Sequence, residues 1–255
     1  MTTLSVARAV AGRSLRHAFT NPALLLPSLL FPLIFLVSFA GGLSAVENTP
    51  DFDFRSGYTS FQFVFVLLQS AAFGGIFAGF GVAFDFESGF MKRLFLAAPK
   101  RSGIVLGYVL SGLLRALFTI VVLTIVGLAA GMKVDGSGGE YLALVALALL
   151  LNMVATLFAT GFAMRTQSLQ AAPAMQLPVF LALFAAPVFV PLHLLDGWLH
   201  AVASWNPATA LLEAGRGFIS GVPDHSGLAF ACVAGLIVIM ALWASRSLRK
   251  AEAGG

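Results

Sequence analysis

Long apolar runs alternate with short polar breaks along the whole of this 255-residue chain. A helix that crosses a bilayer needs about 20 mainly apolar residues. Six runs reach that length, at about 23–46, 58–84, 104–131, 140–164, 170–192 and 226–246. Turn-forming sequences such as Thr49-Pro50-Asp51 separate them. The pattern predicts an all-α integral membrane protein whose residues 23–255 form one domain of six transmembrane helices.

The spans are not alike. The fifth contains Pro173, Pro178, Pro187 and Pro191. Each proline removes a backbone donor and favours a kink, so the freed carbonyls need neighbouring protein or water. We therefore expect a bent and packed helix over 170–192. Small residues at a spacing of four in other spans, such as Gly75/Gly79 and Gly103/Gly107/Ser111, favour close helix contacts.

Residues 193–225 are too polar for a full span and too apolar for an open loop. Asn206 and Pro207 suit the N-cap and first position of a helix that runs to about Ser220, with Gly221 as its stop. On that helix Glu213 and Arg216 lie three residues apart and can pair. We expect a re-entrant helical hairpin that dips into the membrane from outside before the last span.

The N-terminal segment, residues 1–22, has a different periodicity. Over 3–20, Val6 and Val10 share one arc at helical spacing, and Arg13 and Arg16 share the opposite arc. This pattern predicts an amphipathic helix that lies on the membrane. A plain basic flank before the first span accounts for the charges equally well.

Composition and charge place the chain in a membrane. Hydrophobic residues make up 59% of it and charged residues 10%, whereas soluble domains carry about 25% charged residues. Eleven Lys and Arg residues fall on the side of the termini, three on the other side and one inside a span. By the positive-inside rule, the protein is predicted to lie in the cell membrane with both termini in the cytoplasm. The placement of the basic residues explains the net charge of +4, so no nucleic acid partner is expected. A cleaved signal peptide is the alternative for the first run, but Leu43-Ser44-Ala45 is a poor cleavage site.

The loop 85–103 between the second and third spans is the most informative polar segment. Phe86, Phe90 and Leu94 recur every four residues, so one short helix would carry an apolar ridge on a charged body, and Pro99 would end it. Such a ridge on the cytoplasmic side can contact lipid headgroups or insert into a partner's groove. The pattern alone does not choose between them.

Motifs for chemistry are missing from the sequence. It has no GxxxxGK[ST] phosphate loop, HExxH zinc motif or GxSxG elbow, and its four unclustered histidines predict no metal site. Arg115 lies about 16 Å along the third span by helical rise. An ionisable group there suggests an intramembrane polar site, although an arginine that snorkels to the interface is an equal alternative.

The loop and the hairpin together resemble a known family. The residues that carry the resemblance are Asp85, Phe86, Glu87, Gly89, Phe90, Leu94, Pro99 and Arg101 in the loop, and Asn206, Pro207, Glu213, Arg216 and Gly221 in the hairpin. In this order the chain resembles the permease subunits of ABC type-2 (ABC-2) exporters, especially the daunorubicin-resistance-like branch. The likeness covers essentially the whole chain.

The resemblance implies a membrane subunit that is not an enzyme and binds no cofactor, because ATP and Mg²⁺ are held by a separate ATP-binding subunit. Two permeases, identical or paralogous, would join two such subunits in contact with membrane lipid. The loop residues would couple ATPase to permease, with Glu87 and Arg101 at its charged positions. The cargo would be a hydrophobic drug, antibiotic or lipid. One alternative is an ion-coupled secondary transporter, which usually needs several ionisable residues near the middle of the membrane, whereas this chain offers only Arg115. The other is a non-transporting membrane scaffold.

Overall fold

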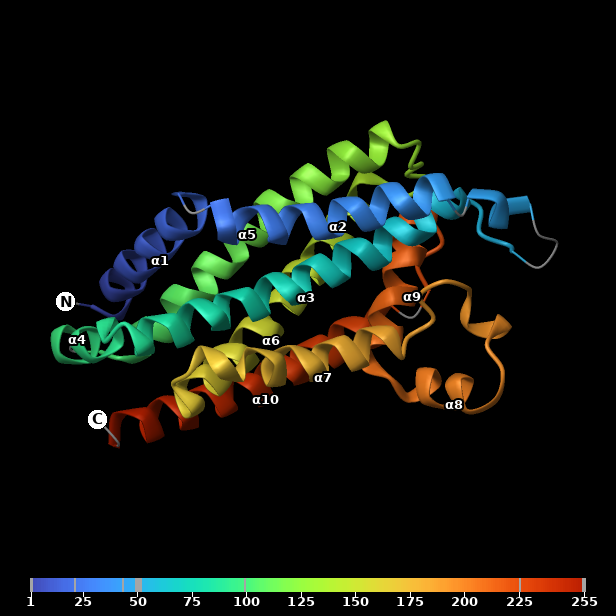
Figure 1. Ribbon diagram of the computed structural model, residues 1–255. Helices are drawn as coiled ribbons and strands as arrows, with labels where there is room; N and C mark the ends of the chain where they lie inside the picture. Colours follow the sequence, from blue (N-terminus) through green and yellow to red (C-terminus); the bar gives the residue numbers. More distant parts are fainter. Residues whose placement is uncertain are drawn as a thin grey trace.

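The computed structural model describes residues 2–20, 22–42, 44–48, 52–98, 100–224 and 226–253. The regular elements in these residues are ten α-helices and three short 3₁₀ helices (Figure 1). The α-helices are α1 Thr3–Thr20, α2 Pro22–Gly42, α3 Gly57–Glu87, α4 Phe90–Ala97, α5 Ser102–Ala129, α6 Gly138–Thr166, α7 Ala172–Phe184, α8 Gly197–Trp205, α9 Pro207–Ser220 and α10 Ser226–Ala253. The 3₁₀ helices are η1 Ser44–Asn48, η2 Leu169–Ala171 and η3 Leu192–Leu194.

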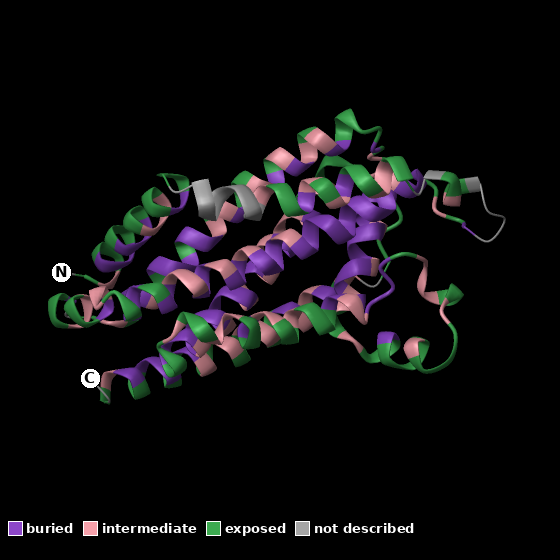
Figure 2. Ribbon diagram, in the orientation of Figure 1, coloured by how far each residue is buried: buried purple, intermediate pink, exposed green. Residues whose placement is uncertain are grey.

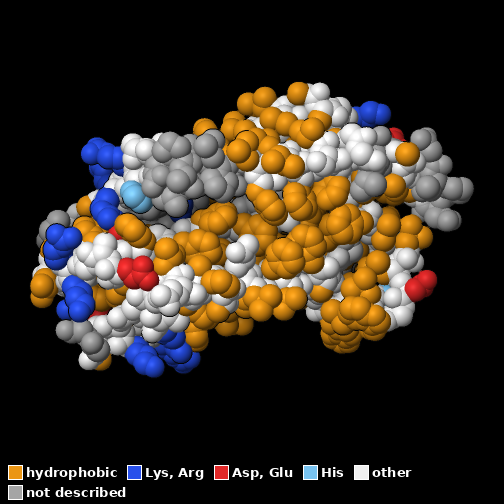
Figure 3. Space-filling view, in the orientation of Figure 1, with side chains coloured by type: hydrophobic (Ala, Val, Ile, Leu, Met, Phe, Trp, Pro, Cys, Tyr) orange, Lys and Arg blue, Asp and Glu red, His pale blue; other side chains and the backbone are white. Residues whose placement is uncertain are grey.

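The helices form an elongated bundle with two different ends (Figure 1). Both termini, α1 and α4 lie at one end, called here the terminal end. The segments η1, α8 and α9 lie at the other, called the hairpin end. Lys and Arg side chains gather at the terminal end, and the middle of the visible face is mostly hydrophobic (Figure 3).

The centre of the bundle is α3, whose side chains are buried along most of its length (Figure 2). Glycines let α6 approach it closely. A Cβ on Gly75 would lie 2.6 Å from the Cβ of Ala155, and one on Gly79 would lie 2.4 Å from that of Ala159. Any larger residue at either position would push the two helices apart, so the predicted close contact is confirmed for this pair.

Four of the described helices are long and apolar enough to cross a membrane: α3, α5, α6 and α10. Leu29–Gly42 and Leu169–Phe184 are shorter apolar helical stretches. On α5 and α10 many large apolar side chains remain exposed, among them Val121, Ile125, Val238 and Ile239. Such surfaces suit a lipid environment, and the predicted class of helical membrane protein is confirmed.

The predicted helix over 170–192 is wrong in its second half. The helix α7 ends at Phe184 after 13 residues, a length of about 20 Å against a hydrocarbon core of about 30 Å. Pro178 is accommodated inside α7. The chain then runs irregularly past Pro187 and Pro191, neither of which can donate a helical hydrogen bond.

The helix predicted after Asn206 is confirmed, with its cap and its end. The side chain of Asn206 accepts a hydrogen bond of 3.0 Å from the backbone N–H of Ala208, so it caps α9, and Pro207 is the first helical residue. The helix ends at Ser220, and Gly221 takes the left-handed conformation with φ +73°. The cap and stop were thus both readable from residue type.

The amphipathic helix over 3–20 is confirmed as α1, but its apolar arc is not free to lie on lipid. Val6, Ala7, Val10 and Ala11 are buried. They pack against α5, where a Cβ on Gly107 would lie 2.6 Å from the Cβ of Val10. The helix is therefore part of the bundle at the terminal end.

Candidate functional site

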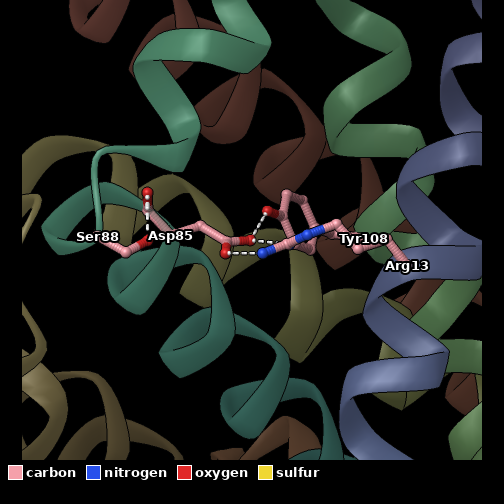
Figure 4. A network of polar contacts seen from close by, with 4 residues as sticks. All are labelled: Arg13, Asp85, Ser88 and Tyr108. Atoms are coloured by element: carbon pink, nitrogen blue, oxygen red, sulfur yellow. Dashed lines mark hydrogen bonds and ion pairs between the residues drawn. The ribbon is translucent and has the colours of Figure 1, made fainter.

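A polar network at the terminal end joins three helices that are distant in sequence (Figure 4). Asp85, in the last turn of α3, is buried. Its carboxylate accepts two hydrogen bonds from the guanidinium of Arg13 on α1, at 2.9 and 2.8 Å. It also accepts one from the hydroxyl of Tyr108 on α5. This bidentate geometry is the stronger form of an arginine–carboxylate pair.

The fourth helix of this cluster is α4. The guanidinium carbon of Arg13 lies 3.6 Å from the centroid of the Phe90 ring, which is a close cation–π contact. Burial by itself would lower the pKa of Arg13, but the hydrogen bonds and charge of Asp85 raise it. Arg13 is therefore held as a cation between a buried carboxylate and an aromatic face.

The predicted ridge of Phe86, Phe90 and Leu94 on one helix is wrong. Gly89 has φ +71° and separates α3, which contains Phe86, from α4, which begins at Phe90. Phe86 instead packs against Phe95, with ring centroids 6.0 Å apart. The left-handed residue turns the chain, because that conformation is one that glycine adopts without penalty.

The charged positions of this loop bond within the chain. The carboxylate of Glu87 accepts hydrogen bonds from the backbone N–H of Leu169 at 2.7 Å and the hydroxyl of Ser168 at 3.1 Å, so it fixes η2 to the end of α3. Arg101 lies 3.7 Å from the carboxylate of Glu252 at the end of α10. Pro99 lies outside the described residues.

The helix α4 has one buried and one free side. Met91 is buried and Leu94 is half-buried, while Leu96 is 88% exposed. A shallow groove of about 640 Å³ runs beside it, lined by residues of α4, the start of α5 and the end of α10, including Arg101 and Arg249. The groove at the terminal end thus presents an exposed apolar residue beside two arginines and Glu252.

A second polar cluster lies at the hairpin end. Arg216 is almost wholly buried on α9 and donates to the carboxylate of Glu213 at 2.8 Å, so the predicted pair is confirmed. It also donates to the backbone oxygen of Val188 at 3.2 Å and stacks on Phe61 at 3.4 Å. Arg216 therefore binds the irregular segment after α7 to α3.

Two members of the terminal-end network were not found from sequence. The periodicity places Arg13 in a charged arc of an amphipathic helix, and Tyr108 stands in an apolar run with no polar neighbour to mark it. The signal for a partner was Asp85 itself, because a carboxylate at the end of a buried span needs a donor or a cation.

Arg115, the predicted intramembrane site, lines a cavity between α1, α3 and α5. It is separate from both polar clusters. Among the described residues there is no group of three or more His, Cys, Asp or Glu side chains placed to hold a metal.

The amino-acid sequence of this chain is similar to those of known proteins. The pattern of the ABC-2 type transporter family matches residues 6–219. The chain is 26% identical over 210 residues to ycf38 of Porphyra purpurea, which is named as a transport permease. The aligned region covers 80% of this chain and 70% of the relative. It is 24% identical over 241 residues to the daunorubicin resistance ABC transporter permease protein DrrB1 of Streptomyces coeruleorubidus, covering 91% and 82%.

A third relative, DrrC of Mycobacterium tuberculosis, is named for doxorubicin resistance and is 23% identical over 189 residues, covering 73% of this chain and 68% of the relative. Permeases of this family lack ATPase activity, bind no cofactor themselves and pair with ATP-binding subunits. The family match spans most of the chain, including most of α1, the terminal-end network and nearly all of α9. The chain therefore belongs to the ABC-2 type transporter family, as a permease membrane subunit.

Proposed function

We propose that this permease is the membrane half of an ATP-driven exporter that crosses the bilayer six times with both termini in the cytoplasm. The observation that carries the proposal is the gathering of Lys and Arg at the terminal end (Figure 3). That asymmetry marks the cytoplasmic side by the positive-inside rule. The cargo leaves the cytoplasm or inner leaflet towards the hairpin end.

Four crossings are supplied by α3, α5, α6 and α10, and the proposal assigns the other two to α2 and to α7 with its irregular continuation. Non-helical backbone at membrane depth is tolerated only where protein or water satisfies it. The backbone oxygen of Val188 accepts hydrogen bonds from Gln62 at 3.1 Å and from Arg216 at 3.2 Å. The oxygen of Phe189 accepts one from the Tyr58 hydroxyl at 3.4 Å. These contacts support a crossing whose second half is not helical.

The ATP-binding subunit docks at the terminal end, on α4 and the groove beside it. Leu96 projects from α4 with almost its whole side chain free, beside Arg101 and Arg249. Glu252 also lines the groove and pairs with Arg101, which leaves Arg249 as the basic residue beside Leu96 that a partner's acidic group could meet. An exposed apolar residue beside such a charge suits a partner groove with an apolar floor and an acidic rim. The free side of α4 supports a partner over lipid headgroups as the proposed contact of this helix.

Movement at this surface has a direct route into the core. The helix α4 follows α3 after only Ser88 and Gly89. The pair of Arg13 and Asp85 ties α1 to the same end of α3. A displacement of α4 or α1 on ATP binding therefore acts on the most buried helix of the bundle, and two permeases, identical or paralogous, would open a path between them.

The test uses the full chain reconstituted with its ATP-binding subunit in phospholipid vesicles. Daunorubicin is the first cargo to try, since DrrB1 is named for resistance to it. We expect ATP-dependent daunorubicin efflux that needs both subunits. Efflux by the permease alone, or driven by an ion gradient without ATP, would contradict the exporter proposal.

The docking site is tested by Leu96→Glu. A buried acidic residue in an apolar contact costs several kcal/mol, so we expect at least a tenfold loss of affinity for the ATP-binding subunit. Val222→Glu is the matched control, because Val222 is an exposed aliphatic residue at the hairpin end. If both variants bind the ATP-binding subunit as the wild type does, α4 is not the docking element.

A separate role is proposed for Glu87. Its carboxylate holds η2 by two hydrogen bonds, so Glu87→Ala should uncouple ATP hydrolysis from efflux while insertion stays intact. Glu87→Gln keeps an acceptor oxygen and should retain more coupling. Normal export by Glu87→Ala would remove this role.

A further inference from the structure

The α1–α3–α5 cavity is not used by the docking surface or by either polar cluster. Its volume is about 290 Å³. Its walls are mainly apolar and aromatic, with Phe77, Phe80 and Phe84 from α3 and Phe118 from α5. The ring of His17 on α1 stacks on Phe84 at 6.0 Å, and Phe19 meets Phe118 edge-on at 5.3 Å.

One formal charge faces this cavity from the described residues, and it is unpaired. Arg115 lines the cavity, and its Nε is buried without a hydrogen-bond partner. No Asp or Glu is among the described lining residues. Asp85, one residue beyond Phe84, is already engaged by Arg13 and Tyr108. Arg115 therefore has no internal counter-charge in the described part of the chain.

An unpaired guanidinium in such surroundings is costly. The effective penalty for burying an ion is several kcal/mol unless a counter-charge or hydrogen bonds offset it. Arg115 is only partly exposed and its Nε is shielded, so snorkelling still leaves part of the guanidinium without a hydrogen-bond partner. A group that enters the cavity and accepts hydrogen bonds from the guanidinium would remove that penalty.

The chemistry of that group follows from the walls and the charge. Phosphate and carboxylate oxygens match the guanidinium fork bidentately. The phenylalanines offer apolar surface for the remainder of the ligand. Pockets for small molecules begin at about 300 Å³, so this cavity holds a headgroup and the first part of a chain, not a whole lipid.

We propose that the α1–α3–α5 cavity binds an amphiphile by its acidic headgroup, with phosphate or carboxylate on Arg115 and the apolar part against the phenylalanine walls. The amphiphile comes either from the bilayer, as an anionic phospholipid, or from the exported cargo. Only the second source rests on the proposed exporter function. Binding itself needs neither ATP nor a partner subunit.

The experiment measures ligand binding to the full chain in detergent by native mass spectrometry. The probes are dioctanoyl phosphatidylglycerol, as a bilayer phospholipid, and dodecyl phosphate, as a single-chain acidic amphiphile. Dioctanoylglycerol is the uncharged comparison. We expect at least one acidic probe to bind tenfold more tightly than dioctanoylglycerol. Preference for the first probe assigns the site to phospholipid, and preference for the second assigns it to cargo-like amphiphiles.

Arg115→Gln should lower the affinity for the acidic probe about tenfold, and Arg115→Lys should lose less because it keeps the charge but not the fork. The matched control is Arg246→Gln, which removes an exposed arginine of α10 and should change nothing. Gly81→Leu tests the cavity without touching its charge. A Cβ on Gly81, which lines the cavity, meets nothing within 4 Å, so a leucine there should fill the space and also reduce binding.

Unchanged affinity in Gly81→Leu would place the acidic probe elsewhere and overturn the proposal, even if Arg115→Gln failed to fold. Equal affinity for dioctanoylglycerol and the acidic probes would overturn it as well. Because all these measurements are made without ATP, a failure here is distinct from a failure of the transport assay.

Discussion

The two polar clusters at opposite ends of the bundle contain the same kinds of side chain, but they differ in which member of the arginine–carboxylate pair is buried. Each has an arginine that pairs with a carboxylate and stacks on a phenylalanine. At the terminal end the carboxylate of Asp85 is buried and Arg13 is 41% exposed. At the hairpin end Arg216 is buried and Glu213 is 38% exposed.

This reversal has consequences for what each cluster can hold together. The terminal-end network joins α1, α3 and α5, and its members Arg13 and Asp85 are 72 positions apart in the sequence. The ion pair at the hairpin end spans three residues of one helix, and its long-range contacts are made by the buried arginine alone. The first is a tertiary link that depends on its exposed member, and the second is an anchor that depends on its buried member.

The largest effect should come from Arg13→Ala. The change leaves the buried carboxylate of Asp85 with Tyr108 but without a cation, at a cost of about 3 kcal/mol. Thermal unfolding in detergent, followed by tryptophan fluorescence, should show a clearly lower midpoint, and proteases should cut α1 sooner. Arg16→Ala is the matched control, because Arg16 is exposed on the same helix.

The double variant Arg13→Ala/Asp85→Asn sharpens this prediction. Removing the stranded charge should recover a large part of the stability. If Arg13→Ala unfolds at the same temperature as Arg16→Ala, the link between α1 and α3 does not depend on this ion pair.

A smaller effect is expected from Glu213→Ala at the hairpin end. Arg216 keeps the Val188 oxygen and the Phe61 ring, whereas Asp85 without Arg13 keeps only the Tyr108 hydroxyl. The cost is therefore expected to be smaller, about 1–2 kcal/mol. The same unfolding assay should rank it between Arg13→Ala and the wild type. A loss greater than that of Arg13→Ala would reverse the comparison of the two clusters.

The smallest effect should come from Asn206→Ala. The cap of α9 is lost, at a cost of about 1 kcal/mol. The side-chain amide also donates to the backbone oxygen of Ala182 on α7 at 2.6 Å. Asn206→Asp separates these roles, since aspartate caps the helix but cannot donate. Equal unfolding midpoints for Asn206→Ala and the wild type would show that the cap contributes nothing.

The parts of the structure that could be predicted from sequence are those decided by local chemistry. The cap at Asn206, the stop at Gly221 and the pair of Glu213 with Arg216 involve neighbours within one helix. The apolar runs likewise revealed α3, α5, α6 and α10. Bilayer thickness is a fixed external constraint, so length and hydropathy are sufficient there.

The errors have two origins: at Gly89 a glycine in the left-handed conformation interrupts the periodicity, and elsewhere a contact from a distant part of the chain decides. The break at Gly89 and the early end of α7 at Phe184 both interrupt runs whose periodicity or hydropathy favoured continuation. In the second case Gln62 and Arg216 satisfy a carbonyl that a helix would otherwise have bonded. The partners of Asp85 come from residues 13 and 108, and no local spacing indicates such a meeting. The roles of the loop residues in coupling remain predictions.

The short joint between α3 and α4 makes the central helix a lever. Its 31 residues give α3 a length of about 46 Å. A displacement of α4 would act on α3 at Glu87, next to the turn at Gly89. A tilt of about 5° imposed there would carry the far end of α3 sideways through about 4 Å. Tyr58 and Phe61 ride on that far end beside Arg216. A small angular displacement at the terminal end is thus enough to change which residues meet at the hairpin end.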